Sequence, residues 1–158
     1  MALSNFLKAL ALLSLTLCVA SAEFEFIFKT TVDGESNIPV LTDAQTGGAK
    51  AYFDVIWEGD YFTWYMEVEG IQNMTMAHIH MFANGSLAMY HHPLTGSFSY
   101  AGNFTAADFL APIDGEEAED LFILMALGKA YVNIHTTAFP AGMLRGNLVA
   151  NLTEWLGA

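Results

Sequence analysis

The sequence has 158 residues, enough for one ordinary domain, and a formal net charge of −12 that arises from 17 acidic and 5 basic residues. Such an acidic surface repels nucleic acid and anionic membranes, so cations, basic proteins and neutral ligands remain as partners. The single cysteine, Cys18, excludes an internal disulfide. The fold must therefore depend on packing, glycans or a bound ligand.

Residues 1–22 have the layout of a secretory signal peptide. Lys8 precedes an apolar run over residues 9–20, and Ala20-Ser21-Ala22 offers a small-x-small cleavage site. The uncharged stretch is too short for a membrane span, which needs ~20 residues. A lipoprotein site at Cys18 is disfavoured because Leu17 stands where a small residue is expected. We expect cleavage to leave residues 23–158 as a single secreted domain.

Four Asn-x-Ser/Thr sequons favour the same secretory route. They are expected N-glycosylation sites if the source is a eukaryote. The acceptor residues are Asn73, Asn84, Asn103 and Asn151.

Apolar and polar residues alternate in a series of segments that predict β-strands. These segments are residues 24–31, 49–57, 61–69, 75–82, 87–91, 97–100, 130–136 and 144–152. Residues 58–60 read as a hairpin turn, and Asn84-Gly85 is a strong turn dipeptide. In the third segment, one face is formed by Phe62, Trp64, Met66 and Val68 and is expected in the core.

One helix is expected before the seventh strand. Asp114 is a candidate cap, acidic residues stand at positions 116, 117, 119 and 120, residues 121–127 are apolar, and Gly128 is a stop signal. A shorter helical turn is expected after Thr105. The many strands and single short helix predict an all-β fold, an antiparallel Greek-key sandwich or barrel.

Three histidines form the strongest candidate site. In a strand, His78 and His80 point to one face, ~6.6 Å apart. In the later strand, His135 alternates with core-type Val132 and Ile134. If the two strands are neighbours, three neutral imidazoles meet and leave an open position that suits copper or zinc. Histidines also serve as partly buried hydrogen-bonding groups, and this alternative stays open.

A second histidine pair, His91 and His92, precedes Pro93 in a turn-like stretch. That context favours a surface loop. One member of the pair is nevertheless a candidate for an additional metal ligand.

Several motifs in order along the chain resemble the CHRD domain family, first described in chordin. They are Ile38-Pro39, Gly47-Gly48-Ala49, Ala77-His78-Ile79-His80, Gly102-Asn103-Phe104-Thr105, Tyr131-Val132-Asn133-Ile134-His135-Thr136 and the closing Phe139-Pro140-Ala141-Gly142-Met143-Leu144-Arg145-Gly146-Asn147-Leu148. The chain departs from the family by having Met81-Phe82 in place of Gly-Pro and Met143 in place of an acidic residue. Neither departure touches the histidines.

The CHRD pattern is more distantly similar to copper-zinc superoxide dismutase. That resemblance implies a superoxide-dismutase-like sandwich, with an immunoglobulin-like one as the alternative. It also implies that the copper ligands are His78, His80 and His135, and that Arg145 guides an anion. No counterpart of a zinc-binding loop is found in the sequence, so copper is favoured over zinc.

Three functions follow as hypotheses. The first is a secreted binding module with a three-histidine copper site. The second is a metal-free protein-binding or structural module of the cell surface or matrix, with Tyr61, Tyr65 and Tyr90 as contact candidates. The third is a copper-only dismutase-like oxidoreductase, which we rank last because the acidic charge repels an anionic substrate. No catalytic residue is assigned, apart from Arg145 under the third hypothesis.

Overall fold

The computed structural model describes residues 26–81, 86–90, 94–109, 115 and 117–150. Its strands are β1 (Phe26–Val32), β2 (Lys50–Trp57), β3 (Phe62–Met81), β4 (Ser86–Tyr90), β5 (Leu94–Phe104), β6 (Ala130–Thr136), β7 (Leu144–Asn147) and β8 (Val149–Ala150). Its helical segments are α2 (Asp43–Thr46), η1 (Ala106–Asp108) and α3 (Ala118–Ala126). Every strand pair is antiparallel, which confirms the predicted all-β class.

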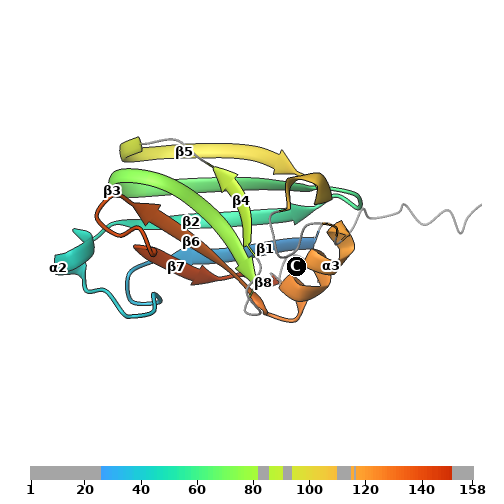
Figure 1. Cartoon of the computed structure of the whole chain (residues 1–158), viewed down its shortest axis with the longest axis horizontal. Helices are drawn as coiled ribbons and strands as arrows, with labels where there is room; N and C mark the ends of the chain where they lie inside the picture. Colours follow the sequence, from blue (N-terminus) through green and yellow to red (C-terminus); the bar gives the residue numbers. More distant parts are fainter. Residues whose placement is uncertain (1–25, 82–85, 91–93, 110–114, 116, 151–158) are drawn as a thin grey trace, which may run out of the picture.

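The strands form two layers that share β3 (Figure 1). The first half of β3 pairs with β2 and β5, and β2 continues to β1 and β8. The second half of β3 pairs with β4 and β6, and β6 continues to β7. One long strand therefore carries the chain from one layer to the other.

Together the two layers form a barrel. It is nearly closed where β7 meets the end of β1. Asp33 and Arg145 exchange both backbone hydrogen bonds, at N–O distances of 3.0 and 2.9 Å. Gly146, the next residue of β7, permits this close approach, because a Cβ at its position would overlap the carbonyl oxygen of Thr31. We call this contact the seam of the barrel.

The core lies between the two layers. Its largest fully buried side chains come from several strands and from α3: Phe28, Phe53, Phe62, Met66, Ile71, Met74, Ile79, Leu121, Met125, Ile134 and Leu144. The predicted core face of residues 62–68 is confirmed, since all four of its side chains are buried. In α3, Leu121 and Met125 face this core, and the ring of Phe122 packs edge-on against Phe26 and Phe28.

The predicted elements are recovered with some differences in extent. The strands predicted at residues 61–69 and 75–82 are one continuous strand, β3, and the one predicted at 97–100 extends to 94–104 as β5. The last predicted strand is interrupted at Leu148, giving β7 and β8. The helical turn after Thr105 is present as η1, whereas α2 was not predicted.

Several expectations concern residues outside this description. The signal peptide at residues 1–22 and the cap candidate Asp114 lie outside the described residues. The N-cap of α3 is Glu117, which has extended backbone dihedrals before the helix begins. None of the helices in the described part of the chain combines the length and the hydrophobicity of a membrane-spanning segment.

Candidate metal centre

The pairing of β3 with β6 brings the three predicted histidines together. In this ladder Met76 lies opposite His135, and His80 lies opposite Tyr131. Ala77 and Ile79 are buried in the core, so strand alternation turns His78 and His80 to the outer face of the sheet. On β6, Val132 and Ile134 face the core for the same reason, which turns His135 to that outer face.

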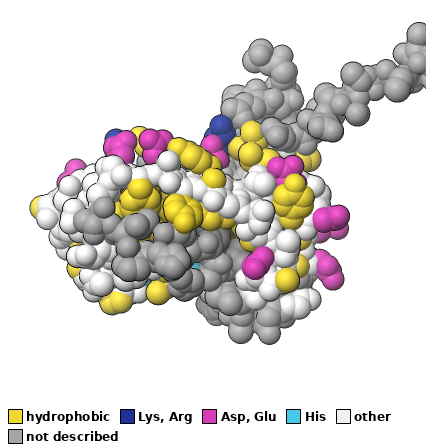
Figure 2. Space-filling view, turned by 90° about the horizontal axis from the view of Figure 1, so that it is seen from above, with side chains coloured by type: hydrophobic (Ala, Val, Ile, Leu, Met, Phe, Trp, Pro, Cys, Tyr) yellow, Lys and Arg dark blue, Asp and Glu magenta, His cyan; other side chains and the backbone are white. Residues whose placement is uncertain are grey.

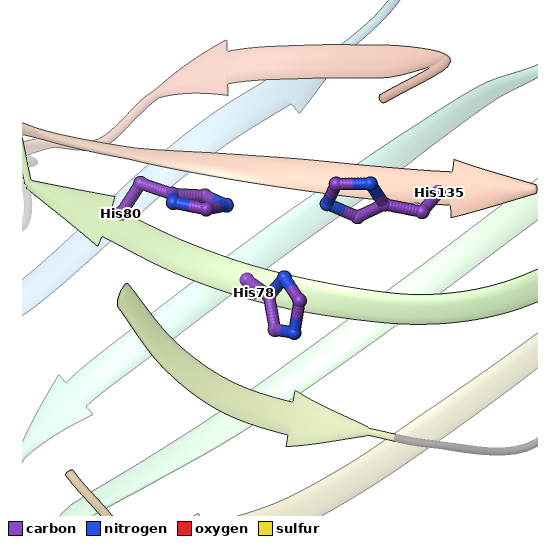
Figure 3. A group of neighbouring side chains, drawn as sticks. All are labelled: His78, His80 and His135. Carbon is purple, nitrogen blue, oxygen red and sulfur yellow. The ribbon is translucent and has the colours of Figure 1, made fainter. Parts of the chain in front are cut away.

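The imidazole rings surround a common space (Figure 3). The rings of His80 and His135 extend toward each other, and His78 lies between them. One nitrogen from each ring lies within 4.8 Å of one from each of the others. Ring centroids are 5.3 Å apart for His78 and His80, 5.0 Å for His78 and His135, and 6.2 Å for His80 and His135.

The tautomer of His135 is set by a hydrogen bond to the backbone. Its Nδ1 donates to the carbonyl oxygen of Pro140 at 2.9 Å, so Nε2 keeps its lone pair. That Nε2 atom is buried and has no hydrogen-bond partner among the described residues. A histidine fixed through one ring nitrogen, with the other presented inward, is the usual arrangement of a metal ligand.

His80 is held in its neutral form. Burial, with smaller contributions from His135 and Arg145, lowers the pKa of His80 from its ordinary value of 6.5 to about 4. Its Nε2 is also buried without a hydrogen-bond partner in the described part of the structure. At neutral pH this ring therefore offers the unprotonated nitrogen that a metal ion requires.

The donor set fits a late first-row metal ion. Two nitrogen ligands of one ion lie at most ~4.2 Å apart, because metal–nitrogen bonds are ~2.0–2.1 Å. The nitrogens, within 4.8 Å of one another, need only a small closure to reach that separation. Buried polar atoms without partners are uncommon and costly in folded proteins, and a bound ion would satisfy both Nε2 atoms.

Arg145 contacts an aromatic ring beside the cluster. Its guanidinium carbon lies 3.6 Å from the centroid of the Tyr131 ring. Tyr131 in turn stacks on His80, with centroids 5.0 Å apart and ring planes 14° from parallel. Tyr131 was not predicted as a site residue, although its position two residues before Asn133 and four before His135 places it on the histidine face.

The remaining candidate residues divide into described and undescribed ones. His91, His92, Asn84 and Asn151 lie outside the described residues, as does the side chain of Tyr90. Asn73 and Asn103 are exposed on β3 and β5, where a glycan has access to the side chain. Tyr61 and Tyr65 are also exposed, by 40% and 43%.

The surface carries the acidic character expected from the sequence. Figure 2 shows Asp and Glu side chains along the upper and right-hand edges of one face, with few Lys or Arg side chains among them. By contrast, the cluster itself contains no carboxylate among the described residues. Only imidazoles could hold an ion there. A metal bound there would be held by neutral nitrogen ligands rather than by surface charge.

These observations define a class: an antiparallel β-barrel domain with a three-histidine cluster on the outer face of two paired strands. A family model for the CHRD domain matches residues 28–148, a range that contains all three histidines. The chain therefore belongs to the CHRD domain family. No curated protein and no solved structure matches it.

Proposed function

We propose that this protein is a secreted CHRD-domain binding module that holds one copper ion through His78, His80 and His135. The observation that carries the proposal is the convergence of three imidazole nitrogens within 4.8 Å on neighbouring strands. Two of the rings present buried Nε2 atoms without partners in the described structure, and one of these rings is already oriented by the Pro140 carbonyl.

Copper is favoured over zinc by the ligands themselves. For a given set of nitrogen donors, Cu²⁺ binds more tightly than Zn²⁺. Three imidazoles with an open position also accommodate zinc, so the two ions are expected to compete for one site. The distant resemblance of the CHRD pattern to copper-zinc superoxide dismutase also favours copper.

The extracellular part of the proposal is supported by the N-terminal segment and the sequons. Residues 1–22 have the features of a cleaved signal peptide. Two of the four sequon asparagines, Asn73 and Asn103, are exposed. CHRD-family membership agrees with export, and the acidic surface leaves a cation as a permitted partner.

One preparation tests both parts. The full chain is expressed in a secreting eukaryotic host in copper-supplemented medium, and the secreted product is analysed by intact mass and metal content. We expect a chain that begins at Glu23, a mass that falls on enzymatic deglycosylation, and about one copper per chain, because the three histidines form a single cluster. A chain that stays in the cell with residues 1–22 still attached would refute export.

Matched variants decide whether the cluster holds the ion. His78→Ala and His135→Ala are expected to lose bound copper, because removing one of three ligands leaves a two-coordinate remnant. Glu67→Gln, which removes an exposed carboxylate from the same strand, is expected to retain it. Equal copper in His78→Ala and in the unmodified chain would contradict the proposal. A weakened site in His91→Gln or His92→Gln would identify an additional ligand.

A further inference from the structure

Three side chains from three neighbouring strands stack beside the histidine cluster. The imidazole of His80 from β3 lies against the ring of Tyr131 from β6, at 5.0 Å between centroids and 14° between planes. The guanidinium of Arg145 from β7 lies 3.6 Å from the centroid of the same ring. Because β6 runs between β3 and β7, Tyr131 separates the other two. We call these three residues the stacked column.

The column supplies His80 with a contact of a different kind from the one that orients His135. The ring of His135 is fixed by the hydrogen bond to Pro140. Within the described part of the chain, His80 has no such hydrogen bond. Its imidazole plane is instead defined by near-parallel stacking on Tyr131. Metal-binding histidines normally need an outer contact that fixes the ring, and stacking can provide one.

The strand register explains why the column forms. His80 lies directly opposite Tyr131, and Arg145 lies opposite Asn133, two residues along β6. Directly opposed side chains on neighbouring strands lie ~4.5–5.5 Å apart at Cβ, and a diagonal neighbour is within reach of a long side chain. Arg145 thus reaches Tyr131 from β7, whereas His80 contacts it from β3.

We propose that Tyr131 and Arg145 are positioning residues that fix the imidazole plane of His80. Tyr131 provides the flat surface, and Arg145 from β7 holds that ring through a cation–π contact. The consequence for metal affinity rests on the proposed copper site. The orientation of the ring is a property of the metal-free protein and can be measured without any ion.

The first measurement is made on the metal-free chain. The carbon-bound protons of the His80 imidazole are observed by NMR, where stacking on Tyr131 shifts their signals upfield. In Tyr131→Leu we expect these signals to move downfield, whereas Tyr131→Phe keeps the stack and the signals. Tyr65→Leu, the same change at an exposed tyrosine elsewhere on β3, is expected to leave them in place. Unmoved His80 signals in a folded Tyr131→Leu chain would overturn the inference.

The second measurement is the affinity for copper alone. Loss of the outer contacts of a ligating histidine weakens metal binding about 10- to 100-fold. We expect a loss of this size in Tyr131→Leu, no loss in Tyr131→Phe, and a smaller loss in Arg145→Lys, which keeps the charge but not the planar contact. Equal affinity in all of these variants would refute a positioning role.

The two measurements separate this inference from the proposed function. If the unmodified chain binds no copper but the His80 signals still shift in Tyr131→Leu, the copper proposal fails. The inference that Tyr131 orients the His80 ring is then still supported. If Tyr131→Leu does not fold, Arg145→Lys gives the decisive result through the same His80 signals. Unchanged signals in that variant would remove Arg145 from the column.

Discussion

The folded protein strongly resists protonation of His80. Burial, together with His135 and Arg145, lowers the pKa of His80 from 6.5 to about 4. The unfolded chain therefore binds a proton at this residue at a pH where the folded chain does not. By linkage, protonation of His80 does not reduce the free energy of unfolding above about pH 6.5. That free energy decreases as the pH falls toward 4.

We therefore predict a specific pH dependence for the metal-free protein. Urea denaturation at several pH values should show the free energy of unfolding falling between pH 6.5 and 4. In His80→Gln this decrease should be shallower, because the titrating group is gone while a polar side chain of similar size remains. Parallel curves for the two proteins would show that other groups cause the acid sensitivity.

The candidate site was predictable at the level of single residues because its signals are local. Strand alternation around Ala77-His78-Ile79-His80 and around Ile134-His135 assigned the histidines to the face opposite the core. What alternation cannot supply is the register between two strands. That register decides that His80 faces Tyr131 and not a residue two positions away.

At the scale of elements, β3 shows why a search for alternating apolar and polar residues can miss the full length of an irregular strand. Its core-facing residues alternate regularly up to Val68, then follow at every third position as Ile71, Met74 and Ala77. Each wider step holds one extra residue, and the ladders to β5 and β6 shift register at these points. Such bulges bend a strand. The sequence pattern breaks where β3 bends, so two strands were predicted.

Two residues with positive φ mark these bulges and allow a test. Gly70 has φ +68° and Asn73 has φ +50°. A Cβ at Gly70 would have open space, with Ala49 Cα nearest at 3.9 Å. Gly70→Ala is therefore expected to cost ~1 kcal/mol through backbone conformation alone. Asn73→Gly should be neutral or slightly stabilising. Thermal or urea unfolding measures both changes. An unchanged stability in Gly70→Ala would contradict the bulge geometry.

At the scale of the whole molecule, the seam between β7 and the end of β1 joins segments more than 100 residues apart. Asn37 adds to it by donating its side-chain Nδ2–H to the carbonyl of Gly142 at 3.0 Å. No local pattern encodes such a contact, so the sequence could predict a sandwich or barrel but not how the barrel closes. The only visible trace was Gly146 in the Leu-Arg-Gly motif.

Gly146 gives the corresponding prediction. A Cβ at this position would overlap the carbonyl oxygen of Thr31 and the hydroxyl of Thr30. Because backbone has to move to admit it, Gly146→Ala is expected to destabilise the protein by ~2–3 kcal/mol. The neighbouring exposed residue offers a control, since Asn147→Ala should change stability by less than ~0.5 kcal/mol. Hydrogen exchange should locate the Gly146→Ala effect at β1 and β7, and uniform loss of protection would argue against a local seam.

Arg145 takes part in two of these features at once. Its backbone N–H and C=O join Asp33 across the seam, and its side chain rests on Tyr131 in the column. If β7 has not paired with the end of β1, Arg145 lacks the backbone hydrogen bonds that help to place its side chain against Tyr131. Under the proposed function, the copper site would therefore depend on pairing between segments at opposite ends of the described chain.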